Sequence, residues 1–257
     1  MAWACYTSFI AGRQRVELYT YDHIDVPDGV TLLCAEDIIP RHSVFQKFGS
    51  FAPFSDLFRY TLLHERGGWW VDSDVYYTGK LIPKGDIIFA EEGPGVINNA
   101  LIKFPQRHPI LAEAISRFGK MDMNNIKWGE TGPKMLTDLI REQGLDGSAV
   151  PADVLYPIHW IEVYKLWLPE FSSYIDDKTI TSPFVHLWAS TFKRHDWSRP
   201  PPSSFMDRIY RRAGVYDRYE LKALNDVVIR RKVNKYILDA WVDKYWNEPF
   251  FLDLRKV

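Results

Sequence analysis

The chain has 257 residues, 46% hydrophobic and 25% charged, a composition that excludes an intrinsically disordered protein. Its formal net charge of −1 gives no overall positive field, so we expect no nucleic-acid partner and only local anion sites. Cys5 and Cys34, the only cysteines, cannot form a disulfide framework or a zinc site, and thiols in a reducing compartment are expected. No apolar run reaches the roughly 20 residues of a membrane-spanning helix, and no signal peptide is evident, which predicts a cytoplasmic protein.

The N-terminal quarter predicts two strands and a long helix. Residues 15–21 alternate polar and apolar side chains, and residues 30–35 are rich in β-forming types, so both predict strands. A turn is expected at Pro27–Gly29, and a loop with a helical turn at 36–51. Residues 52–68 give the clearest helical pattern in the chain.

The limits of this helix can be predicted from its end residues. Ser55 is a candidate N-cap, with Asp56 near the positive end of the helix dipole. Gly67 and Gly68 are expected to stop the helix. Residues 69–77 (WWVDSDVYY) then predict one strand with acids at its centre.

The remaining elements complete an α/β pattern. Strands are predicted at 86–92, 154–158 and 183–188, with the segment 96–104 pairing with the first of them. Helices are predicted at 109–119 and 133–143, the latter with Thr131 as a cap. Because strands alternate with helices, we predict a mainly parallel sheet flanked by helices.

A second region is expected after Pro200–Pro202, where the pattern becomes helical. We therefore predict a catalytic domain at 1–199 and a helical C-terminal extension at 200–257. The basic stretches 208–212 and 230–235 of this extension predict either contact with an anionic membrane surface or a solvated helical face with ion pairs.

Asp72 and Asp74 are the strongest candidates for a chemical site. In a regular strand, side chains two residues apart point to the same side, so both carboxylates can converge. Such a pair repels itself unless a cation lies between, and Mn²⁺ or Mg²⁺ would accept carboxylate and phosphate oxygens. The alternative is a solvated turn, which fits the flanking aromatic residues poorly.

Asp56 and Arg59 lie three residues apart, on one face of the predicted helix. They form either an exposed intrahelical ion pair of little energetic value or a pair that contacts sugar hydroxyls and phosphate. The sequence leaves both alternatives open.

The stretch SDLFRYTLLHERGGWWVDSDV, residues 55–75, resembles the glycosyltransferase family with a D-x-D sugar-binding region. That family includes capsular-polysaccharide transferases, yeast-type initiating mannosyltransferases and globotriaosylceramide-type α-1,4-galactosyltransferases, and the clostridial glucosylating toxins carry a related block. The matching positions are Ser55, Asp56, Arg59, Tyr60, Gly67, Gly68, Asp72 and Asp74. The resemblance extends more weakly over residues 6–188 and leaves the tail outside.

The resemblance implies a GT-A fold and a retaining transfer from a nucleotide sugar, with UDP-sugar favoured over GDP-sugar, to a glycan, lipid or polysaccharide acceptor. It implies that Asp74 binds the metal, that Asp72 binds the metal or the donor ribose, and that Asp56 and Arg59 bind the donor sugar. No catalytic nucleophile is implied.

Further residues are assigned by the same resemblance, each with an alternative. His186 would be a third metal ligand, or else a buried core histidine. Asn98 and Asn99 would lie near the donor sugar, or else shape a loop. Tyr19 and Tyr21 would stack on the nucleotide base, although core packing is favoured.

One departure from the family concerns the start of the chain. Family members begin with a strand that helps to hold the nucleotide, whereas ACYTSFIAG aligns with the helix after it, so this strand is expected to be missing or replaced. A sugar-nucleotide- or carbohydrate-binding protein without activity is therefore the main alternative to the transferase. A D-x-D phosphatase with Asp72 as nucleophile fits less well, because Val75 and Tyr76 follow the pair.

Overall fold

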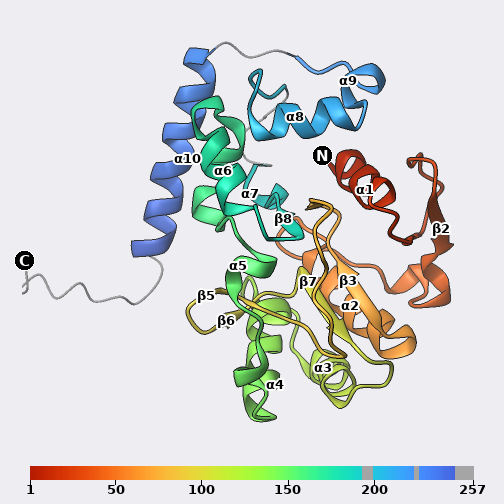
Figure 1. The fold of residues 1–257 in the computed structure, drawn as a ribbon. Helices are drawn as coiled ribbons and strands as arrows, with labels where there is room; N and C mark the ends of the chain where they lie inside the picture. The colour runs from red at the N-terminus through yellow and green to blue at the C-terminus, as the bar shows by residue number, and fades with distance from the viewer. Residues whose placement is uncertain (193–198, 223–225, 247–257) are drawn as a thin grey trace, which may run out of the picture. The chain divides into compact units, whose positions relative to one another are not determined.

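The computed structural model describes residues 1–192, 199–222 and 226–246, and shows a mixed α/β protein (Figure 1). Its α-helices are α1 (Ala2–Ala11), α2 (Ala52–Arg66), α3 (Pro109–Lys120), α4 (Met135–Glu142), α5 (Ala152–Leu155), α6 (Ser172–Lys178), α7 (Ala189–Phe192), α8 (Phe205–Arg212), α9 (Val215–Arg218) and α10 (Asp226–Trp246). Its strands are β1 (Val16–Thr20), β2 (Val30–Cys34), β3 (Gly68–Val71), β4 (Val75–Tyr77), β5 (Glu91–Gly93), β6 (Val96–Ile97), β7 (Leu101–Phe104) and β8 (Phe184–His186). Short helical turns are η1 (Ala35–Asp37), η2 (Arg41–Ser43), η3 (Glu130–Lys134), η4 (Asp146–Ser148), η5 (Trp160–Trp167) and η6 (Pro169–Phe171).

The strand pairing does not confirm the predicted mainly parallel sheet. Among the described residues, β1 pairs with β2 in parallel, whereas β3–β7, β4–β8 and β5–β6 are antiparallel. Parallel neighbours need a crossover of about a dozen residues. The chain from β3 to β7 contains no helix that could provide one, so these strands turn back on their neighbours.

The predicted strand 69–77 is divided by a turn at Ser73–Asp74. The Asp72 amide donates to the Ala100 carbonyl (2.9 Å), and the Val75 amide donates back to the Asp72 carbonyl (3.1 Å). Residues 72–74 therefore leave the strand, and the prediction of a single regular strand is wrong at the two acids.

Helix α2 begins at Ala52 and ends before Gly67, as predicted. Gly67 closes it with φ of 66°, and a Cβ there would lie 2.5 Å from the Gln106 backbone nitrogen, so only glycine fits. At the start, the residue before the first turn is Phe51, and the Ser50 hydroxyl accepts from the Ala52 amide. Ser55 lies inside the helix, so its prediction as the N-cap is wrong.

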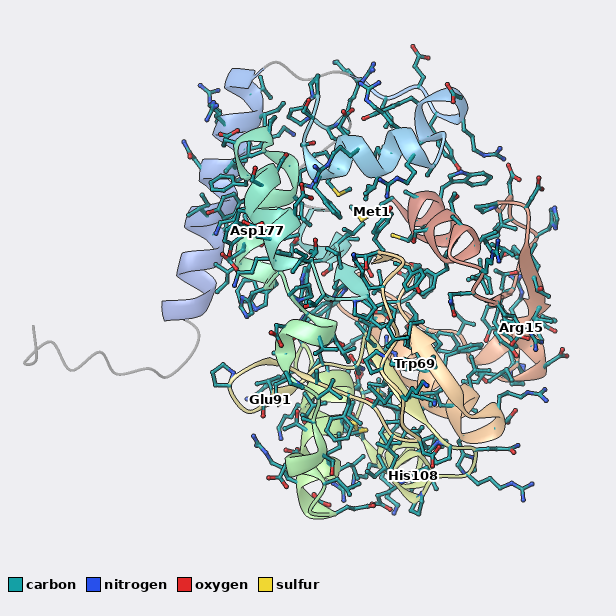
Figure 2. All side chains as sticks on the ribbon, viewed as in Figure 1. Met1, Arg15, Trp69, Glu91, His108 and Asp177 are labelled. Carbon is teal, nitrogen blue, oxygen red and sulfur yellow. The ribbon has the colours of Figure 1, made fainter. Side chains whose placement is uncertain are left out.

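A hydrophobic cluster joins α2 to its neighbours. Tyr60 and Leu63 of α2 pack with Phe104 of β7, Leu111 of α3 and Leu136 of α4, all at most 1% exposed. Figure 1 shows α2 beside the β3–β7 pair, and Figure 2 shows side chains filling this region around Trp69. Burial of this face fixes α2 against β3, the strand that Asp72 follows.

Other predicted elements have mixed outcomes. The strands predicted at 15–21, 30–35 and 183–188 are confirmed as β1, β2 and β8, and the helix predicted at 109–119 is confirmed as α3. The turn predicted at 27–29 is present at residues 28–29. The helix at 133–143 is confirmed as α4 preceded by η3, whereas the predicted strand at 86–92 shrinks to β5. The strand predicted at 154–158 is wrong, because α5 begins after Pro151, whose extended backbone (ψ 139°) precedes its first turn.

The chain forms two compact units, residues 1–157 with 178–186, and residues 158–177 with 187–257. In the second unit, Leu168 packs with Ile229 and Val233, and Arg208 pairs with Asp176 at 2.6 Å. The division thus differs from the predicted boundary at 199–200, because 158–177 packs with the C-terminal helices. Residues 223–225 and 247–257 of the predicted extension lie outside the described residues.

Candidate metal and sugar-binding site

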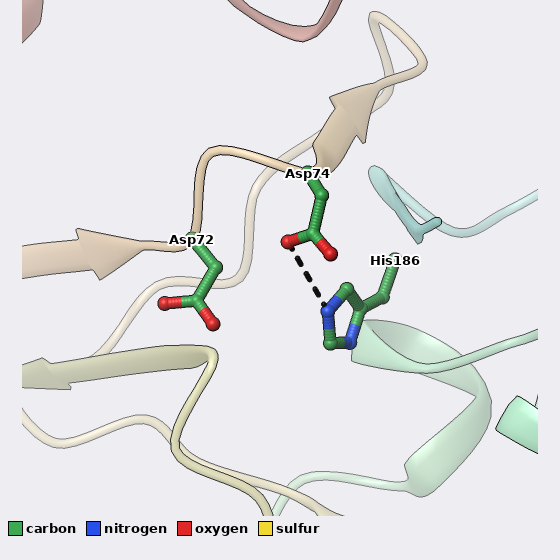
Figure 3. Close-up of side chains that lie close together, drawn as sticks. All are labelled: Asp72, Asp74 and His186. Atoms are coloured by element: carbon green, nitrogen blue, oxygen red, sulfur yellow. Dashed lines mark ion pairs between the residues drawn. The ribbon is translucent and has the colours of Figure 1, made fainter. Parts of the chain in front are cut away.

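Asp72, Asp74 and His186 come together in the first unit. Asp72 follows β3, Asp74 precedes β4, and His186 ends β8. One ligand atom of each lies within 4.8 Å of the others, and Figure 3 shows the three side chains facing a common space. The three residues that the resemblance groups together therefore do lie close to one another.

The backbone explains why these residues converge. Antiparallel pairing of β4 with β8 places Val75 opposite His186, so the histidine lies across from the residue after Asp74. The Asp74 Oδ1 and His186 Nε2 atoms are 3.3 Å apart, the contact dashed in Figure 3. The turn at 73–74, rather than the alternation of a strand, brings Asp72 to the same place.

Asp72 is oriented by two donors. Its Oδ1 accepts from an Arg59 guanidinium nitrogen at 2.8 Å and from the Trp70 indole nitrogen at 2.6 Å. The Asp72 side chain nevertheless remains 28% exposed, against 4% for Arg59. The carboxylate is thus held in one direction and stays accessible to a ligand.

Arg59 also binds Asp56, through a contact of 2.8 Å to Oδ1. Both side chains are buried, which excludes the alternative of an exposed intrahelical pair. Asp56 accepts further from the Asn99 amide (2.8 Å) and the Thr131 hydroxyl (2.7 Å). A buried network therefore links the helix α2, the loop before β7 and the turn η3 to Asp72.

The turn η3 fits closely against this network. A Cβ on Gly132 would lie 2.8 Å from Asp56 Oδ2 and 2.9 Å from Asn99 Nδ2. The Tyr60 hydroxyl contacts the carbonyls of Thr131 and Gly132 at 3.2 Å. Thr131 is thus a partner of Asp56 and not the predicted helix cap, and only glycine at 132 lets the backbone approach.

The electrostatics of the site leave an excess of negative charge. Burial raises the pKa of Asp56, and the negative charge of Asp72 raises it further, whereas the Arg59 charge lowers it. Burial lowers the pKa of His186, but the carboxylates of Asp74 and Asp72 outweigh it and raise this pKa above its ordinary value. The buried Arg59 guanidinium is thus shared by Asp56 and Asp72, and Asp74 contacts His186. Three carboxylates gathered in one region favour a bound cation.

The other predicted residues have different neighbours. Asn98 donates to Glu92 and accepts from the Ala100 amide at 2.6 Å, so it lies one residue from the Asp56 network without entering it. Tyr21 donates to the Ile39 carbonyl (2.7 Å), and Tyr19 packs on Phe58. The two tyrosines thus show the favoured alternative of core packing, and nucleotide stacking stays a prediction.

Several residues at the site were not predicted from the sequence. Glu92 is a partly buried carboxylate on β5, and burial raises its pKa although the Asn98 hydrogen bond and the His186 charge oppose this shift. The Tyr156 hydroxyl accepts from the Leu101 amide, and its ring lies 6.0 Å from that of His186. Trp70 could have been found from its position two residues before Asp72, but no local pattern points to Glu92 or Tyr156.

A comparison with protein families gives a match to part of the chain. A family model described as "Capsular polysaccharide synthesis protein" matches residues 35–87. The matched segment contains Asp56, Arg59, Asp72 and Asp74, and it leaves His186 outside. It supports a relation to a capsule-related, glycosyltransferase-like family and a role in polysaccharide biosynthesis. No curated protein matched the chain.

Proposed function

We propose that this protein is a metal-dependent glycosyltransferase that moves a hexose from a nucleotide sugar to a glycan, lipid-linked or polysaccharide acceptor. A UDP-sugar is favoured over a GDP-sugar as the donor. The observation that carries the proposal is the junction of two groups of side chains. The cluster of Asp72, Asp74 and His186 adjoins the buried Asp56–Arg59 pair through the Arg59–Asp72 contact of 2.8 Å.

The donor atoms of the cluster suit Mn²⁺ or Mg²⁺. Two carboxylates and an imidazole are ligands that Mn²⁺ accepts, and Mg²⁺ is commonly held by one or two carboxylates with phosphate oxygens. Asp74 and His186 would hold the ion directly, and Asp72 would hold the ion or the donor ribose. Such an ion supplies positive charge to the leaving diphosphate.

The residues around Asp56 would bind the donor sugar. Arg59 remains charged because Asp72 and Asp56 raise its pKa although burial opposes the charge. Its orientation is fixed by both carboxylates, so it can donate to a sugar hydroxyl or a phosphate without losing mobility on binding. Asp56 would accept hydrogen bonds from sugar hydroxyls, and the Asn99 amide would donate hydrogen bonds to them.

We propose retention of configuration at the anomeric carbon, as the resemblance to D-x-D transferases implies. The bond from the anomeric carbon to the diphosphate oxygen breaks, the acceptor oxygen bonds on the same face, and its proton passes to the departing diphosphate oxygen. We assign no side chain as nucleophile.

Contact of the C-terminal helices with a membrane surface stays a prediction. Arg208 pairs with Asp176, Arg211 with Asp207 and Arg230 with Glu170, which supports the alternative of a solvated helical face. None of the described helices combines the length and the apolar character that a transmembrane span requires. Flotation with anionic liposomes at low and high salt distinguishes the two alternatives.

The transferase proposal is tested with purified protein, a panel of UDP- and GDP-sugars and Mn²⁺. Thermal shift measures donor binding, and nucleotide release measures slow hydrolysis of the donor. We expect one donor to give both signals, and Asp74→Ala to reduce nucleotide release at least about a hundredfold.

The matched control is Asp176→Asn, an exposed carboxylate of the second unit, which should behave as wild type. Binding without nucleotide release would favour the sugar-nucleotide-binding alternative. Equal release by wild type and Asp74→Ala would contradict the transferase.

A further inference from the structure

Phe48 lies in a strained and exposed turn of the first unit. The Lys47 and Ser50 backbones bond each other at 2.9 Å in both directions, which leaves Phe48 and Gly49 as the two turn residues. Phe48 has φ of 58°, a conformation that costs a residue with a Cβ about 1–2 kcal/mol. Its side chain gains little burial in return, because the residue is 48% exposed. Such strain without a packing reward points to a function of the ring.

Trp128 supplies a second exposed ring beside it. Trp128 is 62% exposed, and its ring lies 6.0 Å from that of Phe48 in an edge arrangement. The two loops are joined by Lys47, whose ammonium donates to the Asn124 carbonyl at 3.3 Å. Two large aromatic rings from separate loops thus form one exposed surface, which we call the aromatic platform.

The platform borders a pocket of about 460 Å³. Trp128 forms part of its wall together with Glu92, Gly95, Val96, Pro133 and Thr137. The cations in this wall are already engaged, because Lys134 pairs with Asp138 at 2.6 Å and Arg141 donates to the Gly95 carbonyl. The wall carries two carboxylates, Glu92 and Asp138, against these two cations. A pocket with an aromatic ring and balanced charges suits a neutral ligand rich in hydroxyl groups better than an anion.

The pocket is connected to the candidate donor site at two points. Trp128 lies three residues before Thr131, whose hydroxyl donates to Asp56. Glu92 in the pocket wall accepts from Asn98, the residue before Asn99, which donates to Asp56. The same turn η3 therefore faces the sugar-binding network on one side and the pocket on the other.

We propose that the pocket and the aromatic platform bind a neutral saccharide of the acceptor, with the Trp128 and Phe48 rings stacked on the C–H faces of its sugar units. The proposal deepens the proposed function, because it names the substrate class that meets the donor. An apolar sugar face covers the exposed rings, and the hydroxyl groups bond to the carboxylates of the wall.

The test is direct binding of neutral oligosaccharides of hexoses and N-acetylhexosamines, first on a glycan array and then by saturation-transfer NMR. Binding is measured without nucleotide and metal, and again with UDP and Mn²⁺. We expect wild type to bind a subset, and Trp128→Ala and Phe48→Asn to bind it about tenfold more weakly. Asn tolerates the positive φ of residue 48, so Phe48→Asn should keep the wild-type melting temperature.

The matched control is Ile180→Ala, which removes an apolar side chain that is 65% exposed and outside the pocket, and should bind as wild type. No saccharide binding by wild type, or unchanged binding by folded Trp128→Ala, would overturn the platform. Because the first arm needs no donor, a failure of the transferase proposal in the nucleotide-release assay is distinguishable from a failure of this one.

Discussion

Two acid–arginine pairs of this protein look alike in sequence and differ in structure. Asp56 and Arg59 lie on α2, and Asp207 and Arg211 lie on α8, each pair within one helical turn. Asp207 accepts from the Ser203 amide, Arg211 and the Tyr216 hydroxyl, and these bonds lower its pKa against the effect of burial. Burial instead raises the pKa of Asp56.

The difference separates a structural pair from a candidate binding site. The Asp207 charge is matched by donors at the start of α8, where a carboxylate is favoured by the helix dipole. Around Asp56 one buried guanidinium is shared with Asp72, and Asp74 adds a further charge to the same region. A cluster of carboxylates that its own cations do not neutralise is the place where a bound cation and a polar substrate gain the most binding free energy.

The largest expected effect on stability comes from Arg59→Met. It leaves Asp56 buried without its cation, and we expect a loss of about 3 kcal/mol or more in the free energy of unfolding. Arg211→Met should cost far less, because this side chain is 56% exposed and Asp207 keeps two other donors. Urea unfolding followed by circular dichroism measures both, and equal losses would contradict the comparison.

A smaller effect is expected from Asp207→Asn, with a dependence on pH. The folded-state pKa of Asp207 is lowered, so its stabilisation is present above the unfolded pKa and is lost as pH falls through the folded pKa. We expect Asp207→Asn to cost about 1–2 kcal/mol at pH 7 and to reduce the loss of stability on acidification. Melting temperatures of the variant and wild type between pH 7 and 3 measure this, and parallel curves would contradict it.

The smallest effect is expected from Thr131→Val, which keeps the side-chain shape and removes the hydroxyl bonded to Asp56 Oδ2. A loss of about 1 kcal/mol in unfolding free energy is expected, together with weaker binding of the donor sugar. Thr61→Val is the control, since the Thr61 hydroxyl bonds only the carbonyl four residues earlier in α2. A loss as large for Thr61→Val would argue against the special position of Thr131.

The sequence predicts more of this site than of the sheet around it. Local spacing predicts the acids, Arg59 and the glycines that end α2, because these residues lie on one helix and at the end of the strand that follows it. The order and direction of the strands depend on contacts far apart in sequence, which alternation of side chains does not encode.

The errors have the same origin. Asp72 and Asp74 were expected to converge through a regular strand, and a turn brings them together. Thr131 is a residue type that often caps helices, but its partner is Asp56, which lies 75 residues away in the sequence. Phe48 and Trp128 lie 80 positions apart and have no local pattern that pairs them, so only the structure shows the aromatic platform.

The most direct test of the account is Mn²⁺ binding, followed by electron paramagnetic resonance of free Mn²⁺ as protein is added. We predict that wild type binds one Mn²⁺, that Asp74→Asn weakens this binding at least about tenfold, and that the control Asp176→Asn leaves it unchanged. Undetectable binding by folded wild type, or equal affinity in Asp74→Asn, would contradict the claim that Asp72, Asp74 and His186 form a metal site.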